Sequence, residues 1–133
     1  MSQSFTLIVH GATPDSQAGA LALRFADAVL DRGHSLYRIF FYHDAVTVAN
    51  ALRVTPEDEP DQASAWLALA ERCGVELAVC IAAAQRRGVI NSTEQQRYQK
   101  SAASALAGFA IVGLGQMIDA AAQADHCITF PAN

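Results

Sequence analysis

Five short apolar segments recur along the chain, and a stretch with helical character separates each from the next. Their apolar residues are nearly continuous instead of alternating with polar ones, which is typical of strands buried on both faces of a parallel sheet. This alternation predicts an α/β fold, a three-layer α/β/α arrangement with a parallel five-stranded sheet, and we expect residues 1–133 to form a single domain. The predicted strands are 5–10, 36–42, 75–79, 109–112 and 126–130, and the predicted helices are 13–32, 45–52, 62–72, 81–87, 91–107 and 116–124.

Local signals set the starts of two of these helices. Residues 13–14 (Thr-Pro) suit the N-cap and the first helical position of the first helix. A capping box is available twice near residue 91, as Asn91 with Glu94 or as Ser92 with Gln95. We therefore expect the first helix to begin at the Thr-Pro pair and a polar helix to begin at 91 or 92.

Composition excludes several classes of protein. The chain carries a net charge of −4 and a single lysine, Lys100, which disfavours a nucleic-acid-binding surface. No apolar run has the length of a membrane span, and the first residues lack a positively charged region and a cleavage site. These features predict a cytoplasmic protein. Hydrophobic residues make up 52% of the chain, enough to supply a subunit interface as well as a core.

The three cysteines stand in different contexts. They are odd in number and have no CxxC spacing, which disfavours both a disulfide framework and a zinc site. Cys80 falls where a buried strand ends and a short alanine-rich helix, stopped by Gly88, begins. Backbone N–H groups and the helix dipole at such a junction lower the pKa of a thiol, so Cys80 is the candidate nucleophile. The alternative is that Cys80 packs as a small hydrophobe, which is the role we expect for Cys73 and Cys127.

Two histidines are expected near Cys80. His10, His43 and Cys80 each close or follow a predicted strand, and in parallel sheets ligands gather at the carboxyl ends of the strands. The histidines are candidates to share or stabilise a proton there, although strand-end histidines are more often plain polar residues. His34 and His126 precede strands, so we expect structural roles for them at the opposite edge.

Two glycine-containing turns leave a ligand-binding alternative open. Residues 11–16 join a strand to a helix, and residues 113–115 (Gly-Leu-Gly) do the same. Neither has the GxGxxG or GxxxxGK[ST] pattern of a phosphate-binding loop, so tight turns are the default interpretation.

Several segments together resemble the DsrE/TusD family of small sulfur-carrier subunits, those of the DsrEFH and TusBCD complexes. The most specific is the run from the cysteine through Arg-Arg-Gly. The matching segments are 40–42 (Phe-Phe-Tyr), 46–50, 65–66 (Ala-Trp), 80–89 (Cys-Ile-Ala-Ala-Ala-Gln-Arg-Arg-Gly-Val), 108–109, 113–115 and 124–125.

The resemblance implies a sulfurtransferase with a DsrE-like α/β domain. The family cysteine at the position of Cys80 accepts a sulfane sulfur as a persulfide and passes it to a partner protein's cysteine, with no metal or organic cofactor. The expected partners are two related small subunits in a heterohexamer, and upstream and downstream carrier proteins with reactive cysteines. Family members feed either 2-thiolation of the wobble uridine of tRNA or dissimilatory sulfur oxidation. Direct contact with nucleic acid or membrane is not expected.

Two alternatives stand beside this interpretation. The chain is a non-catalytic structural subunit whose partner holds the working cysteine, or it binds a small molecule or nucleotide at the turns 11–16 and 113–115.

Overall fold

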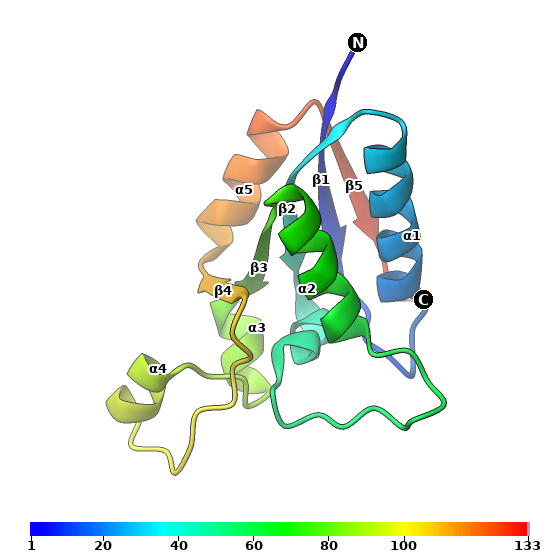
Figure 1. Ribbon diagram of the computed structural model, residues 1–133. Coiled ribbons are helices and arrows are strands. Elements are labelled where there is room, and N and C mark those ends of the chain that lie inside the picture. The colour runs from blue at the N-terminus through cyan, green and yellow to red at the C-terminus, as the bar shows by residue number, and fades with distance from the viewer. Residues whose placement is uncertain (133) are drawn as a thin grey trace.

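The fold is a five-stranded parallel sheet covered by helices on both faces, as the sequence predicts (Figure 1). The computed structural model describes residues 1–132. Strand order is β4-β3-β2-β1-β5, and every neighbouring pair is parallel. The strands are β1 (Ser4–Val9), β2 (Ser35–Phe41), β3 (Glu76–Cys80), β4 (Phe109–Val112) and β5 (His126–Phe130).

The direction of the crossovers decides which face each helix covers. From β1 to β4 each strand is added on the same side of its predecessor, whereas β5 returns to the far side of β1. Right-handed crossovers then place α1 (Ala18–Asp31) and α2 (Gln62–Cys73) on one face and α5 (Leu114–Gln123) on the other. Figure 1 shows α1 and α2 together in front of the sheet, with α5 apart from them.

The remaining elements gather at the carboxyl edge of the sheet. The 3-10 helix η1 (His43–Ala49) follows β2, while α3 (Ile81–Arg86) and α4 (Ser92–Arg97) follow β3. In Figure 1 they lie at the bottom, where the strand arrows point, beside the long connection from η1 to α2. No helix among residues 1–132 is long and apolar enough to cross a membrane.

Aromatic packing fills the layer between the sheet and α2. The ring of Phe41 meets Trp66 edge-on at a centroid distance of 5.2 Å and Phe109 at 5.8 Å. Trp66 is fully buried, and its indole N–H has no hydrogen-bond partner in the described part of the chain. Its contribution to stability therefore comes from the ring, against the cost of an unpaired donor.

Polar contacts attach α5 to the opposite face. The Thr6 hydroxyl on β1 donates to the Ala120 carbonyl at 2.9 Å. Arg38 on β2 donates to the Gln116 carbonyl at 2.9 Å and pairs with Asp119 on α5 and with Glu76 on β3. Because the Arg38 side chain is largely buried, this network fixes the position of α5 as well as its distance from the sheet.

Several predicted helix boundaries are wrong, beginning with the start of α1. The first helix begins at Ala18 rather than at residue 13: residues 13–15 form a turn in which the Ser16 N–H donates to the Ala12 carbonyl, and the Ser16 hydroxyl accepts from the Ala18 N–H. The turn is therefore stabilised by its own hydrogen bonds and continues past the Thr-Pro pair.

The helix predicted for residues 91–107 ends at Arg97. Gln99 has a φ of +54°, outside the helical region, and the Lys100 N–H turns back to the Gln95 carbonyl. The segment that follows, 98–108, is an extended connection to β4. The 3-10 helix η1 also begins two residues before the helix predicted at 45.

We predict that replacing Trp66 has very different effects depending on the substituent. Trp66→Ala leaves a large cavity and lowers the free energy of unfolding by about 3–5 kcal/mol. Trp66→Phe keeps most of the ring and removes the unpaired N–H, so its loss is less than half of that. Urea denaturation of both variants checks this; equal losses would mean that the indole N–H is satisfied in solution.

Candidate functional site

Cys80 lies at the junction of strand and helix that the sequence predicts. It is the last residue of β3 and the N-cap of α3, with extended backbone angles (φ −64°, ψ 122°). Its backbone pairs in register with Val112 of β4. Of the three cysteines, Cys80 alone stands at the carboxyl edge.

The sheet register places two more side chains in one row with Cys80. Val9, Phe41 and Val79 are paired neighbours, and Phe41 faces α2. The next residue on each strand faces the α5 side, because successive side chains alternate. The row across that face is therefore His10, Tyr42 and Cys80. With strands about 4.8 Å apart, Tyr42 is the direct neighbour of Cys80, and His10 lies roughly 10 Å away along the row.

Cys80 is buried, with 1% of its surface exposed, which is the packing that the alternative of a small hydrophobe predicts for it. The reason is that β3 is an interior strand, flanked by β2 and β4, and that α3 folds directly back from it. The sequence identifies the junction but not what covers it. Cys80 packs in the core of the isolated chain, and a reaction at its sulfur requires α3 or its neighbours to move.

The other two cysteines are exposed, so the prediction that they pack in the interior is wrong. Cys73 is the last residue of α2, where the helix emerges into solvent before Gly74. Cys127 is the second residue of the edge strand β5, and partial burial raises the pKa of its thiol. Both lie away from the carboxyl edge that carries Cys80.

His10 and His43 come together as expected, with Tyr42 in contact with both. The two imidazole centroids are 4.8 Å apart, and Tyr42 stacks on His43 at 4.1 Å and meets His10 edge-on at 5.8 Å. His43 has a φ of +50°, a left-handed conformation that is uncommon for a residue other than glycine. Burial and then the charge of His43 lower the pKa of His10, so His10 is neutral near pH 7.

The histidines at the other edge have structural partners, as predicted. The Gln3 N–H donates to Nδ1 of His34 at 3.0 Å, and the Gln3 side chain is hydrogen-bonded to His126. The ring of His126 also stacks on Phe5 at 4.8 Å. They tie the N-terminal residues to the start of the sheet.

Two interactions hold α3 against the carboxyl edge. Arg87, just after α3, pairs with Asp44 of η1 at 2.9 Å and donates to the Ala83 carbonyl at 3.1 Å. Glu94 of α4 is 3% exposed and accepts from the side chain of Gln85 on α3 at 2.6 Å. Any movement of α3 that uncovers Cys80 has to break these contacts or move the contacting residues together with the helix.

Glu94 also completes the capping box predicted with Asn91. The Glu94 N–H donates to the Asn91 side chain at 2.9 Å, and the Asn91 N–H donates back to the Glu94 carboxylate at 3.2 Å. The sequence predicts this box but not its link to α3, because Gln85 belongs to another element. Tyr42 and Asp44 were likewise missed as site residues. The available signal was that Tyr42 ends the predicted strand 36–42 and that Asp44 follows it two residues later.

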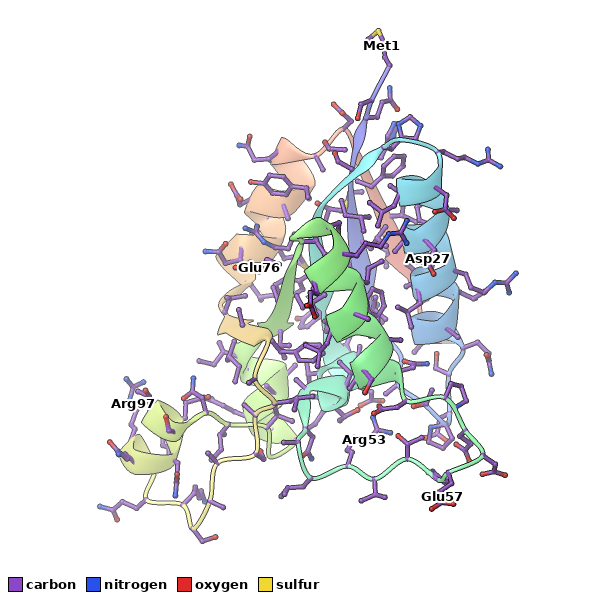
Figure 2. The ribbon with its side chains drawn as sticks, viewed as in Figure 1. Met1, Asp27, Arg53, Glu57, Glu76 and Arg97 are labelled. Carbon is purple, nitrogen blue, oxygen red and sulfur yellow. The ribbon has the colours of Figure 1, made fainter. Side chains whose placement is uncertain are left out.

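The turn at residues 11–16 is closed on one side and hollow on the other. Gly11 is buried, and a Cβ at this position would collide with the Ser16 side chain and the Ala132 backbone. Thr13 and Pro14 line a cavity of about 700 Å³, together with the connection that carries Arg53 and Glu57 (Figure 2) and the first turns of α1 and α2. It is on the α1/α2 face, so it is separate from the row that contains Cys80. Residues 1–132 contain no group of three or more His, Cys, Asp or Glu side chains placed to hold a metal ion.

Fold and site together define a small parallel α/β protein with a cysteine at the strand–helix junction of its carboxyl edge. A model of the DsrE/DsrF-like family matches residues 3–130, and the chain belongs to this family. It is 46% identical over 117 residues to the sulfurtransferase TusD homolog of Pseudomonas aeruginosa, covering 88% of this chain and 89% of that protein. It is 43% identical over 126 residues to sulfurtransferase TusD of Enterobacter sp. strain 638, covering 95% and 98%.

Two further comparisons agree. DsrE of Allochromatium vinosum is 40% identical over 126 residues, covering 95% of this chain and 97% of that protein. The crystal structure of the ychN protein from E. coli superposes with a TM-score of 0.73 at 24% identity, covering 96% and 99% of the two chains. This last likeness shows a shared fold.

We predict that Glu94→Ala loosens the segment from residue 88 to 106. The variant loses the capping box and leaves the Gln85 amide unpaired, so the free energy of unfolding falls by about 1–2 kcal/mol and amide exchange in this segment accelerates. Hydrogen–deuterium exchange measures this. Glu57→Ala, which removes an exposed carboxylate from the loop, is the matched control and changes neither quantity; an unchanged segment in Glu94→Ala would contradict the prediction.

Proposed function

We propose that this chain is a sulfurtransferase subunit that accepts a persulfide sulfur on Cys80 and passes it to a cysteine of a partner protein. The observation that carries the proposal is the place of Cys80: it is the one cysteine at the carboxyl edge, at a strand–helix junction, within the span matched by the family model. The names of the relatives support sulfur transfer as the reaction class.

The chemistry needs no group that the chain lacks. The Cys80 thiolate attacks the outer sulfur of a donor R–S–SH, a new S–S bond forms, and the old one breaks with its electron pair leaving on R–S⁻. The product is Cys80–S–SH, and the proton that Cys80 lost is taken up by the leaving thiolate. No net oxidation or reduction occurs. Transfer onward is the same step with the acceptor's thiolate as nucleophile.

Burial of Cys80 fits a carrier whose sulfur reacts slowly with small molecules, when α3 opens transiently, and faster inside an encounter with a partner. A buried thiol is protected from small thiols in solution, which would otherwise strip a persulfide. We propose that docking of a partner moves α3 and exposes the sulfur.

We further propose that the chain works in a heterohexamer with two related small subunits, between upstream and downstream carrier proteins. Leu114 and Ile118, one turn apart on α5, are 41% and 66% exposed, and such an apolar face supports contact with another subunit. Native mass spectrometry of the complex purified from its source cell tests the stoichiometry. Ile118→Glu is expected to release the chain from that complex without unfolding it.

Cys80→Ser tests the central claim. We predict that the wild-type protein, alone or in its co-purified complex, gains a sulfur at Cys80 after incubation with glutathione persulfide, as located by peptide mass mapping, that reductant reverses this gain, and that Cys80→Ser loses the gain at this position. Circular dichroism checks that the variant is folded.

A double variant supplies the control for this experiment. Cys73→Ser with Cys127→Ser removes the two exposed thiols and is expected to load sulfur as the wild type does. Loading of Cys80→Ser at the wild-type level would overturn the assignment. Loading of the complex only through another subunit's cysteine would instead make this chain its structural subunit.

For the destination of the sulfur we propose the relay for wobble-uridine 2-thiolation of tRNA, with dissimilatory sulfur oxidation as the alternative. The relatives named TusD match at 38–46% identity and DsrE at 40%, so the TusD names favour the thiolation relay by their number and not by their identity. Replacing the gene by its Cys80→Ser form and measuring 2-thiouridine in total tRNA decides between them: loss of the modified nucleoside supports the thiolation relay, and unchanged thiolation with impaired sulfur oxidation supports the alternative.

A further inference from the structure

We propose that the His10–His43 pair is the proton donor and acceptor for the partner's sulfur during transfer to and from Cys80. The inference rests on the proposed function, and it assigns catalytic work to two residues outside the strand–helix junction.

The first step concerns direction. In attack on a disulfide-type bond the nucleophile, the central sulfur and the leaving sulfur lie close to a line, so the leaving sulfur is about 4 Å from Sγ of Cys80, or two S–S bonds of about 2.05 Å. On the β4 side of Cys80 the row continues with Val112, which offers no proton. On the β2 side it continues with Tyr42, His10 and, stacked on Tyr42, His43.

The second step concerns reach. His10 lies roughly 10 Å from Cys80 along the row, too far to act on Cys80 itself. A sulfur that leaves about 4 Å from Cys80 toward β2 covers much of that gap, taking the S–S length as above. His43 is exposed and His10 half-buried, so the pair faces the side from which a partner arrives.

The third step concerns the backbone. His43 is held at a φ of +50°, a conformation that costs free energy for a residue with a Cβ. In this conformation the His43 ring lies 4.8 Å from the His10 ring and stacks on Tyr42, and these contacts offset the cost in free energy. Asparagine adopts this backbone conformation more readily, so a plain turn at this position has no need of histidine.

The electrostatics suit exchange of one proton. Two imidazoles this close do not both stay charged, and burial together with the charge of His43 lowers the pKa of His10. The pair therefore holds a single proton more readily than two, and this proton is the one exchanged. Of the charged residues on the neighbouring elements, Asp44 of η1 and Arg87 after α3 form an ion pair of 2.9 Å, and Arg86 at the end of α3 is exposed to solvent.

The protons balance over one cycle of loading and unloading of Cys80. On loading, the pair protonates the leaving thiolate R–S⁻, and the proton lost by the Cys80 thiol restores the pair through water. On unloading, the pair takes the proton from the acceptor's thiol, whose sulfur attacks Cys80–S–SH, and the thiolate left on Cys80 recovers a proton. The S–S bonds formed and broken are those of the transfer itself.

Two donors with different leaving groups test the inference, in the Cys73→Ser/Cys127→Ser background so that only Cys80 reacts. Glutathione persulfide expels an alkyl thiolate that needs a proton, whereas 5,5′-dithiobis(2-nitrobenzoate) expels an aryl thiolate that does not. We expect His10→Gln and His43→Asn each to slow loading from glutathione persulfide by about 10²-fold, the lower end of general acid–base effects, and to leave the aryl reaction within about threefold. The falling limb of the pH–rate profile at high pH, where the histidine acid loses its proton, should disappear in both variants.

His34→Gln is the matched control, since His34 stands at the opposite edge, and it should change neither rate. Equal slowing of both donors by the His10 and His43 variants, or no slowing of either, would overturn the assignment. The measurements use whichever form, chain or complex, loads sulfur. If neither form loads sulfur, both the carrier proposal and this inference fail. If loading proceeds and the histidine variants slow the two donors equally or not at all, only this inference fails.

Discussion

Backbone pairing among three parallel strands fixes every group at the carboxyl edge. The registers of β1 with β2 and of β2 with β3 bring Val9, Phe41 and Val79 into one row. The side chain of the next residue on each strand must then face the opposite side of the sheet. A shift of one residue in either pairing would turn Tyr42 or Cys80 toward α2. The site therefore depends on the buried core, where Phe41 against Trp66 makes such a shift costly.

The same packing creates a conflict between stability and reactivity. Cys80 contributes to the core as a small apolar side chain, yet a sulfur carrier has to present its sulfur to another protein. What separates the two states is the attachment of α3, a helix of six residues held at its end by Arg87 with Asp44 and by Gln85 with Glu94. Both contacts are polar, and Ala83 and Ala84 of α3 are in addition buried in the core, so the proposed release of α3 has to overcome apolar packing as well. Glu94 is the stronger restraint, because it is buried and bonded on both sides.

Short-range signals in the sequence predicted more of the fold than of the site. β4 and β5 have the boundaries expected from their apolar runs, and the capping box of Asn91 with Glu94 is formed, because these features depend on neighbours in the chain. The predicted start of α1 was wrong because residues 13–15 form a turn and the Ser16 hydroxyl accepts from the Ala18 N–H, a choice made among competing local hydrogen bonds.

The burial of Cys80 and the meeting of His10 with His43 depend on strand order, which no local pattern encodes. The sequence placed these residues at one edge through the general rule for parallel sheets. It gave no means to tell that β3 is an interior strand, that Tyr42 separates the histidines from the cysteine, or that the other two cysteines are exposed. The rule predicts which residues share an edge; the order of the strands decides how far apart they are.

Strand order also explains why one edge suits a relay. In the order β4-β3-β2-β1-β5, Cys80 ends β3 and His10 follows β1. Strand β2, with Tyr42 at its end, therefore separates the proposed acceptor of sulfur from the histidines proposed to move protons. A single enzyme acting on a small substrate gains from close contact between nucleophile and base. For a carrier, the separation of Cys80 from the histidines leaves room for the sulfur of the partner protein's cysteine, which has to lie between them. Across β2 the backbone positions of Cys80 and His10 are roughly 10 Å apart, and two S–S bonds of about 2.05 Å span less than half of this distance, so the partner's sulfur in the proposed transfer lies between them.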